Sequence, residues 1–110
     1  MKQLTVIVNE ALEEVKGENI ITLDVTDITA VMDTVIVVSG STSRQVKALS
    51  NAVIEASKKA GFQPLGVEGM DGGEWVLVDL IDVVVHIMQP AVRDFYELEK
   101  LWSVRPNDTI

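Results

Sequence analysis

The stretch "GEWVLVDLIDVVVHIM", residues 73–88, decides the fold, because it holds two runs of bulky apolar residues around a short polar break. Successive side chains of a β-strand point to opposite faces of the sheet. In both runs this alternation separates a purely aliphatic set of side chains from a mixed set. The stretch therefore predicts a β-hairpin with one face suited to a protein core.

The two sets differ in what they can pack against. The aliphatic set is natural core and consists of Val76, Val78, Leu80, Val83, Val85 and Ile87. The mixed set contains an aromatic residue, a carboxylate and the only histidine of the chain, and consists of Trp75, Leu77, Asp79, Val84, His86 and Met88, with Asp82 beside the turn.

The mixed set has two interpretations. A helix can cover it, with Asp79 and His86 at the wet margin, since a lone histidine within a strand is more often a hydrogen-bonded structural residue than a ligand. Alternatively, it is an exposed apolar patch around Trp75 with a rim of carboxylates, which is typical of a protein-binding site. The alternation of side chains does not choose between them.

The rest of the chain supplies helices and further strands. An amphipathic pattern predicts a first helix that ends near Gly17, and Thr42 and Gln45 have the spacing of a capping box at the start of a second helix. Pro90 suits the first turn of a last helix. The expected order is αββαβββα, which predicts an α+β, α/β sandwich-like fold with a mixed five-stranded sheet flanked by helices. The strands are expected within 19–25, 33–40, 64–69, 74–80 and 82–88.

Length and charge narrow the classes of function. The 110 residues predict a single domain, 1–110, and the formal charge of −8 disfavours non-specific binding to nucleic acid. No apolar run approaches the roughly 18 residues that span a membrane. The N-terminus has the pattern of a helix and not of a signal peptide. We therefore expect a cytoplasmic protein with no membrane contact.

The charges are unevenly distributed along the chain. Residues 60–99 contain eight carboxylates and one basic residue, Arg93, whereas residues 41–61 contain four basic residues and Glu55 alone. The acidic half can meet a basic partner, or it can be a solvated acidic surface, which is the commoner case. Arg44 and Lys47 of the basic segment have two interpretations, proximity to RNA or exposure to solvent alone.

Signals for catalysis and metal binding are weak. Asp79, Asp82 and His86 are the best local ligand set, with Glu68 as a further candidate, but so few ligands do not define a metal site. Gly40 and Ser41 lie between a strand and a helix N-terminus, so with Asp79 and Asp82 they could serve nucleotidyl transfer with Mg²⁺. A Ser-His-Asp triad can be written with Ser41 or Ser43, but nothing places either residue near His86. We therefore expect no enzyme, no cofactor and no metal, and keep a metal-dependent transferase as an alternative.

Three segments together resemble the ribosomal silencing factors, the Iojap-related family. They read "TSRQVKALSNAV", "GVEGMDGGEWVLVDLIDVVVHIM" and "QPAVRDFYELEKLW". They occur in order, and the matches extend from about Asp24 to Trp102. Each segment alone is weak, but the combination is specific.

The resemblance implies a nucleotidyltransferase-like fold without established transferase chemistry. It also implies binding to the large ribosomal subunit through the basic ribosomal protein numbered fourteen at the inter-subunit face, where the factor blocks joining of the small subunit and represses translation. We place that interaction on the hairpin and the last helix. A homodimer of the free chain through the same surface is an alternative. The residues carried over are Trp75, Leu77, Asp79, Asp82, His86, Tyr96, Glu99 and Trp102.

The sequence departs from the family pattern at two positions. The hairpin turn commonly reads Tyr-Gly, and here it is Leu80-Ile81. Because a β-branched residue resists positive φ, we expect this turn to differ. Met88 stands where Phe is common, which is a softer packing choice.

Overall fold

A computed structural model describes residues 3–96 of the chain, without the side chains of residues 95 and 96. The order of helices and strands is the predicted one. The elements are α1 (Leu4–Glu14), β1 (Glu18–Asp24), β2 (Thr34–Ser39), α2 (Ser43–Lys59), β3 (Gly66–Glu68), β4 (Trp75–Asp79), β5 (Val83–Met88) and α3 (Pro90–Tyr96).

The five strands form one mixed sheet in the order β1-β2-β5-β4-β3. The pair β2 and β5 is parallel, and the other neighbouring pairs are antiparallel. The predicted hairpin is confirmed, with Trp75 opposite Met88 and Asp79 opposite Val84. The sheet therefore places the hairpin beside β2, far from it in sequence, and leaves β1 and β3 at the edges.

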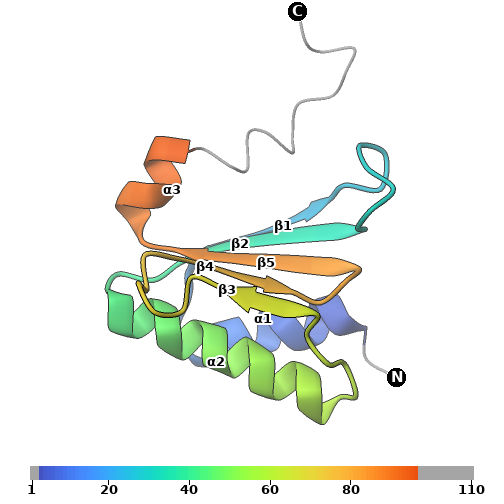
Figure 1. Cartoon of the computed structure of the whole chain (residues 1–110), viewed down its shortest axis with the longest axis horizontal. Helices are drawn as coiled ribbons and strands as arrows, with labels where there is room; N and C mark the ends of the chain where they lie inside the picture. Colours follow the sequence, from blue (N-terminus) through green and yellow to red (C-terminus); the bar gives the residue numbers. More distant parts are fainter. Residues whose placement is uncertain (1–2, 97–110) are drawn as a thin grey trace, which may run out of the picture.

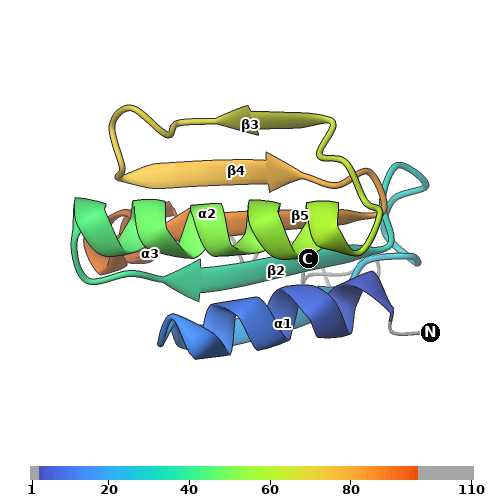
Figure 2. The same ribbon diagram turned by 90° about the horizontal axis from the view of Figure 1, so that it is seen from below.

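The two faces of the sheet are covered differently. Helices α1 and α2 lie side by side along one face, and α3 lies over one end of the other (Figures 1 and 2). The aliphatic hairpin set packs in the core under α1 and α2, as predicted, together with Leu12, Ile36 and Leu49. Burial of each large aliphatic side chain there stabilises the fold by roughly 1.5–3 kcal/mol.

The start of α2 is capped, but in a different way from the predicted capping box. The Thr42 hydroxyl accepts a hydrogen bond from the Gln45 backbone N–H at 3.1 Å. The Gln45 side chain does not return to Thr42; its Nε2 donates to the Val15 carbonyl at 2.6 Å. The box is thus half formed, because Gln45 instead ties α2 to the end of α1.

Helix α1 ends at Glu14, near Gly17 as predicted. The residue with positive φ is Lys16 (φ 62°), not Gly17. A Cβ atom on Gly17 would lie 2.7 Å from Cγ2 of Val38, which is too close. Gly17 is therefore needed for close packing of the chain against β2, and not for the conformation that ends the helix.

The hairpin turn corrects a second expectation. Ile81 has φ 76° in spite of its β-branched side chain. The Asp82 N–H donates to the Leu80 carbonyl at 3.0 Å, which makes Ile81 the central residue of a tight γ-turn. Such turns are strained for non-glycine residues.

Within residues 3–96, none of the helices is long and apolar enough to cross a membrane.

Candidate functional site

The candidate site is the sheet face opposite α1 and α2, which we call the second face. The mixed hairpin set lies on it, and the register places Leu77 opposite His86, between the Trp75–Met88 and Asp79–Val84 pairs. Val35 and Val37 of β2 pack into the same cluster as Met88 and Trp75. The prediction that Trp75, Asp79 and His86 share one face is therefore confirmed.

Burial across the second face is graded from β5 to β4. On β5, Val84, His86 and Met88 are 6%, 8% and 0% exposed. On β4, Trp75 and Leu77 are only partly buried, as is Asp79. Neither interpretation of the mixed set holds for all of it: the β5 row is buried, and the accessible part is the row Trp75, Leu77 and Asp79.

Trp75 and His86 are joined by a hydrogen bond across the hairpin. The indole Nε1–H donates to Nδ1 of His86 at 3.1 Å, and the ring centroids are 6.0 Å apart with the planes tilted by 47°. The two residues are diagonal neighbours, a spacing within reach of aromatic side chains. Since Nδ1 accepts, the imidazole is neutral with its proton on Nε2. The buried His86 thus fixes the orientation of the more accessible Trp75.

This arrangement makes stability depend on pH. Burial lowers the pKa of His86 below its ordinary value of 6.5. As the pH falls, the unfolded chain therefore protonates His86 at a higher pH than the folded chain does. The stability that the neutral, buried His86 contributes to the fold is fully present above about pH 6.5, and it is lost as the pH falls toward the pKa of the folded state. Protonation also removes the acceptor for Trp75.

We expect the wild type to lose more unfolding free energy between pH 7.5 and pH 5.5 than His86→Gln, in urea titrations followed by circular dichroism. Among the described residues, the charged groups near this face include Asp79 and the buried Arg93, and both are common to the two proteins. Parallel pH profiles for the two proteins would show that His86 does not carry this dependence.

The two aspartates of the hairpin have different environments. Oδ1 of Asp79 accepts a hydrogen bond from the Ile81 N–H at 2.8 Å and so stabilises the turn. Asp82 is exposed at the tip of the hairpin, and its carbonyl accepts from the N–H groups of Asp33 and Thr34. In the described part of the chain, no three His, Cys, Asp or Glu side chains are grouped as a metal site would require. Asp79, Asp82, His86 and Glu68 are therefore not brought together as ligands.

The strand register contradicts the geometry that the nucleotidyl-transfer alternative needs. Thr34 pairs with Val83 at one end of β2, and Ser39 pairs with Met88 at the other. Gly40 and Ser41 follow the second end, whereas Asp82 precedes the first. Six strand residues separate the two ends, which corresponds to about 20 Å. The proposed anion site and the carboxylates cannot act on one substrate.

Two contacts near the β5–α3 connection escaped the sequence reasoning. Arg93 of α3 is 6% exposed and Ser39 is 2% exposed, and Nη1 of Arg93 donates to Oγ of Ser39 at 2.9 Å. Nε2 of Gln89 donates to Oγ of Ser43 at 3.0 Å and to the Gly73 carbonyl at 3.1 Å. The three hydrogen bonds anchor the β5–α3 connection. The signal for Arg93 was its position as the lone basic residue of an acidic segment.

Part of the predicted site lies outside the described residues. Glu99 and Trp102 fall beyond residue 96, and so does the side chain of Tyr96. Their assignment to the interaction surface stays a prediction.

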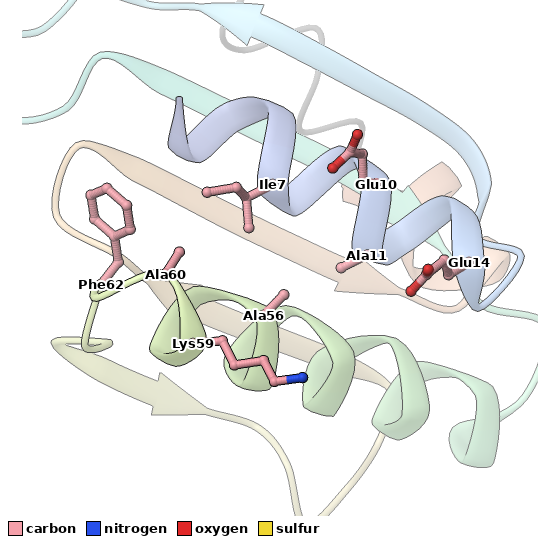
Figure 3. Close-up of a pocket in the computed structure, with 8 residues that line it drawn as sticks. All are labelled: Ile7, Glu10, Ala11, Glu14, Ala56, Lys59, Ala60 and Phe62. Atoms are coloured by element: carbon pink, nitrogen blue, oxygen red, sulfur yellow. The ribbon is translucent and has the colours of Figure 1, made fainter. Parts of the chain in front are cut away.

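A groove lies between α1 and α2, away from the second face. It has a volume of about 480 Å³, and Figure 3 shows Ile7, Ala11, Ala56 and Ala60 pointing into it. Glu10, Glu14 and Lys59 add charges of both signs at its margin. Small side chains and mixed charge suit no particular ligand, so we assign this groove no function.

The structure is a small α+β domain with a tryptophan on the accessible part of one sheet face. Comparison with known proteins shows its relatives. Residues 1–110 match the family described as ribosomal silencing factor during starvation. The chain is 49% identical over 103 residues to the ribosomal silencing factor of Chromobacterium violaceum, covering 94% of this chain and 84% of that protein. A crystal structure of a protein from the same organism has a TM-score of 0.90 at 47% identity, and the match covers 97% of this chain and 90% of that one.

A more distant relative comes from the mouse. It is the protein named mitochondrial assembly of ribosomal large subunit protein 1, which is 35% identical over 79 residues, covering 69% of this chain and 35% of that protein. The chain belongs to the ribosomal silencing factor family, whose members are ribosome-associated regulators of translation. The resemblance noted in the sequence is thereby confirmed.

Proposed function

We propose that this chain binds the large ribosomal subunit through the ribosomal protein numbered fourteen and blocks joining of the small subunit by steric hindrance. The observation that carries the proposal is the accessible row Trp75, Leu77 and Asp79 on β4, held beside the buried β5 row. Membership of the family supports a ribosomal partner. The name of the mouse relative, which refers to the large subunit, supports the choice of particle.

The row has the composition of a protein-binding surface. Trp75 offers a large aromatic area whose orientation is fixed by its bond to His86, so little side-chain entropy is lost on binding. Leu77 continues the apolar surface, and Asp79 provides a carboxylate at its margin. Aromatic residues at the centre of a patch with polar residues at its rim are the usual arrangement of binding hot spots.

Charge supports a basic protein as the partner. The chain has a formal charge of −8, and Asp79 and Asp82 bring carboxylates to the end of the hairpin. Complementary charge mainly speeds association and helps select the partner. Arg44 and Lys47 lie on α2, on the opposite side of the sheet, so any proximity of these residues to ribosomal RNA would be separate from the protein contact.

The mechanism needs no catalysis. A domain held at the inter-subunit face occupies volume that the small subunit requires, and its occupancy alone lowers the number of joined ribosomes. The alternative is a homodimer of the free chain through the second face, which would compete with the ribosomal contact. We place the protein in the cytoplasm with its target.

The proposal is tested by mixing the chain with purified ribosomal subunits. We expect the chain to cosediment with large subunits and not with small subunits, and to lower the fraction of joined ribosomes in a sucrose gradient in proportion to its occupancy. Prior incubation with the isolated ribosomal protein numbered fourteen should compete for the chain. A chain that stays in the supernatant at physiological salt, or binds without reducing subunit joining, would contradict the proposal.

A further inference from the structure

The most exposed large aliphatic side chains of the described residues gather at one end of the sheet. Val31, Leu65 and Ile81 are 76%, 71% and 56% exposed. Val31 lies in the β1–β2 loop, Leu65 immediately before β3, and Ile81 in the β4–β5 turn. These three connections meet at the end of the sheet opposite the start of α3 (Figures 1 and 2). We call this the sheet-end surface.

Backbone hydrogen bonds hold the three connections together. The N–H groups of Asp33 and Thr34 donate to the Asp82 carbonyl at 2.9 and 3.0 Å. The Leu65 N–H donates to the Asp79 carbonyl at 2.8 Å. The β4–β5 turn is therefore bonded to its neighbours on both sides, and the surface is formed before any partner arrives.

Ile81 is kept exposed at the cost of backbone strain. Its φ of 76° is a backbone conformation that suits glycine. Burial of the side chain does not offset this strain, because Ile81 is exposed. An exposed β-branched residue in this conformation costs stability of its own, since strain of this kind persists only where other interactions impose it. Strained positions concentrate at functional sites, which makes Ile81 a candidate contact residue.

The charges around the surface favour a basic partner. Residues 24–34 and 79–83 contain five aspartates and no lysine, arginine or histidine, and Asp33 and Asp82 are exposed. Among the described residues, the lysines near this end are Lys58 and Lys59 in the last turn of α2. RNA is disfavoured because its phosphates would face the aspartates. A second copy is disfavoured because it would present the same carboxylates.

We propose that the sheet-end surface docks a segment of another protein that carries aliphatic side chains flanked by Lys or Arg. The aliphatic side chains would cover Val31, Ile81 and Leu65, and the basic groups would meet Asp33 and Asp82. This goes beyond the ribosomal contact proposed for the second face. The surface lies at the other end of β4 from Trp75, and the two surfaces share Asp79 and Asp82 at the end of the hairpin.

Two synthetic peptides provide the test. Both are amphipathic with the same leucine face, and one has lysine and the other glutamate at the polar positions. In ¹⁵N-correlation spectra of the full chain, we expect the lysine peptide to shift the amides of residues 27–33, 65–66 and 80–83 in a saturable manner, and the glutamate peptide to leave them unchanged. A single-stranded RNA oligonucleotide should also leave them unchanged.

Ile81→Gly separates binding from folding. It removes the contact side chain and also relieves the strain, so we expect weaker binding of the lysine peptide by about ten-fold together with a Tm raised by ~2–6 °C. Asp33→Asn with Asp82→Asn should weaken binding and reduce its salt dependence. Val6→Ser, which removes an exposed aliphatic side chain from α1, should leave binding unchanged.

Three outcomes would overturn the proposal: no saturable shift with the lysine peptide, equal shifts with the glutamate peptide or RNA, or wild-type affinity in Ile81→Gly. None of these outcomes depends on binding to the ribosome, so the proposal about the second face stands or falls separately.

Discussion

Trp75→Ala is expected to lower the affinity of the chain for the large ribosomal subunit by about 2 kcal/mol or more, which is roughly thirty-fold. The substitution removes the largest accessible side chain of the second face. It also leaves Nδ1 of the buried His86 without its donor. Cosedimentation with large subunits over a range of subunit concentrations measures the change.

A conservative variant separates the two losses. Trp75→Phe keeps most of the apolar area but lacks the N–H group, so we expect it to bind less tightly than the wild type and more tightly than Trp75→Ala. The Tm of each variant shows whether the fold is retained. If a folded Trp75→Ala protein binds large subunits with wild-type affinity, the second face is not the ribosomal contact.

Gly69→Ala is expected to have the largest effect on stability, a loss of roughly 3 kcal/mol or more in unfolding free energy. Gly69 has φ +88°, and a Cβ atom there would lie 2.1 Å from the Trp75 carbonyl oxygen. An alanine therefore meets both an unfavourable backbone conformation and the backbone of β4. The start of β4, including Trp75, would have to move to accept it.

Two other glycines provide matched controls. Gly61 has φ +92° and no atom within 4 Å of the added Cβ, so Gly61→Ala should cost only the conformational term, about 1–2 kcal/mol. Gly72 has neither a positive φ nor a close neighbour, so Gly72→Ala should be nearly neutral. Urea denaturation followed by circular dichroism ranks the three. Equal losses for Gly69→Ala and Gly61→Ala would show that the contact with Trp75 is relieved at no cost.

Several features of this protein follow from local sequence patterns. The order of helices and strands, the cap at Thr42 and the two faces of the hairpin were all predictable. Each depends on residues within one helical turn or one strand, where the repeat of 3.6 or 2 residues specifies which side chains share a face. The positive φ of Gly61 belongs with them, since glycine closes a helix by a local preference.

Other features depend on chain segments that are distant in sequence. Gln45 bonds to Val15 and not back to Thr42, because the end of α1 supplies an acceptor that no local pattern reveals. Gly17 is required by contact with Val38. Ile81 adopts a glycine-like conformation because bonds from Asp79 and within the turn outweigh the preference of a β-branched residue.

The sequence by itself determined that Trp75, Asp79 and His86 share one face of a hairpin, since alternation along a strand is a property of the backbone. Only the tertiary structure decided that His86 is buried while Trp75 remains accessible, that Gly40 and Asp82 lie at opposite ends of the sheet, and that the three connections with exposed aliphatic residues lie at one end. These outcomes follow from the order of the strands across the sheet, in which β5 lies between β2 and β4 and β3 lies at the edge beside β4. The partner of a strand is selected by packing across the whole domain, which the periodicity of a single segment does not record.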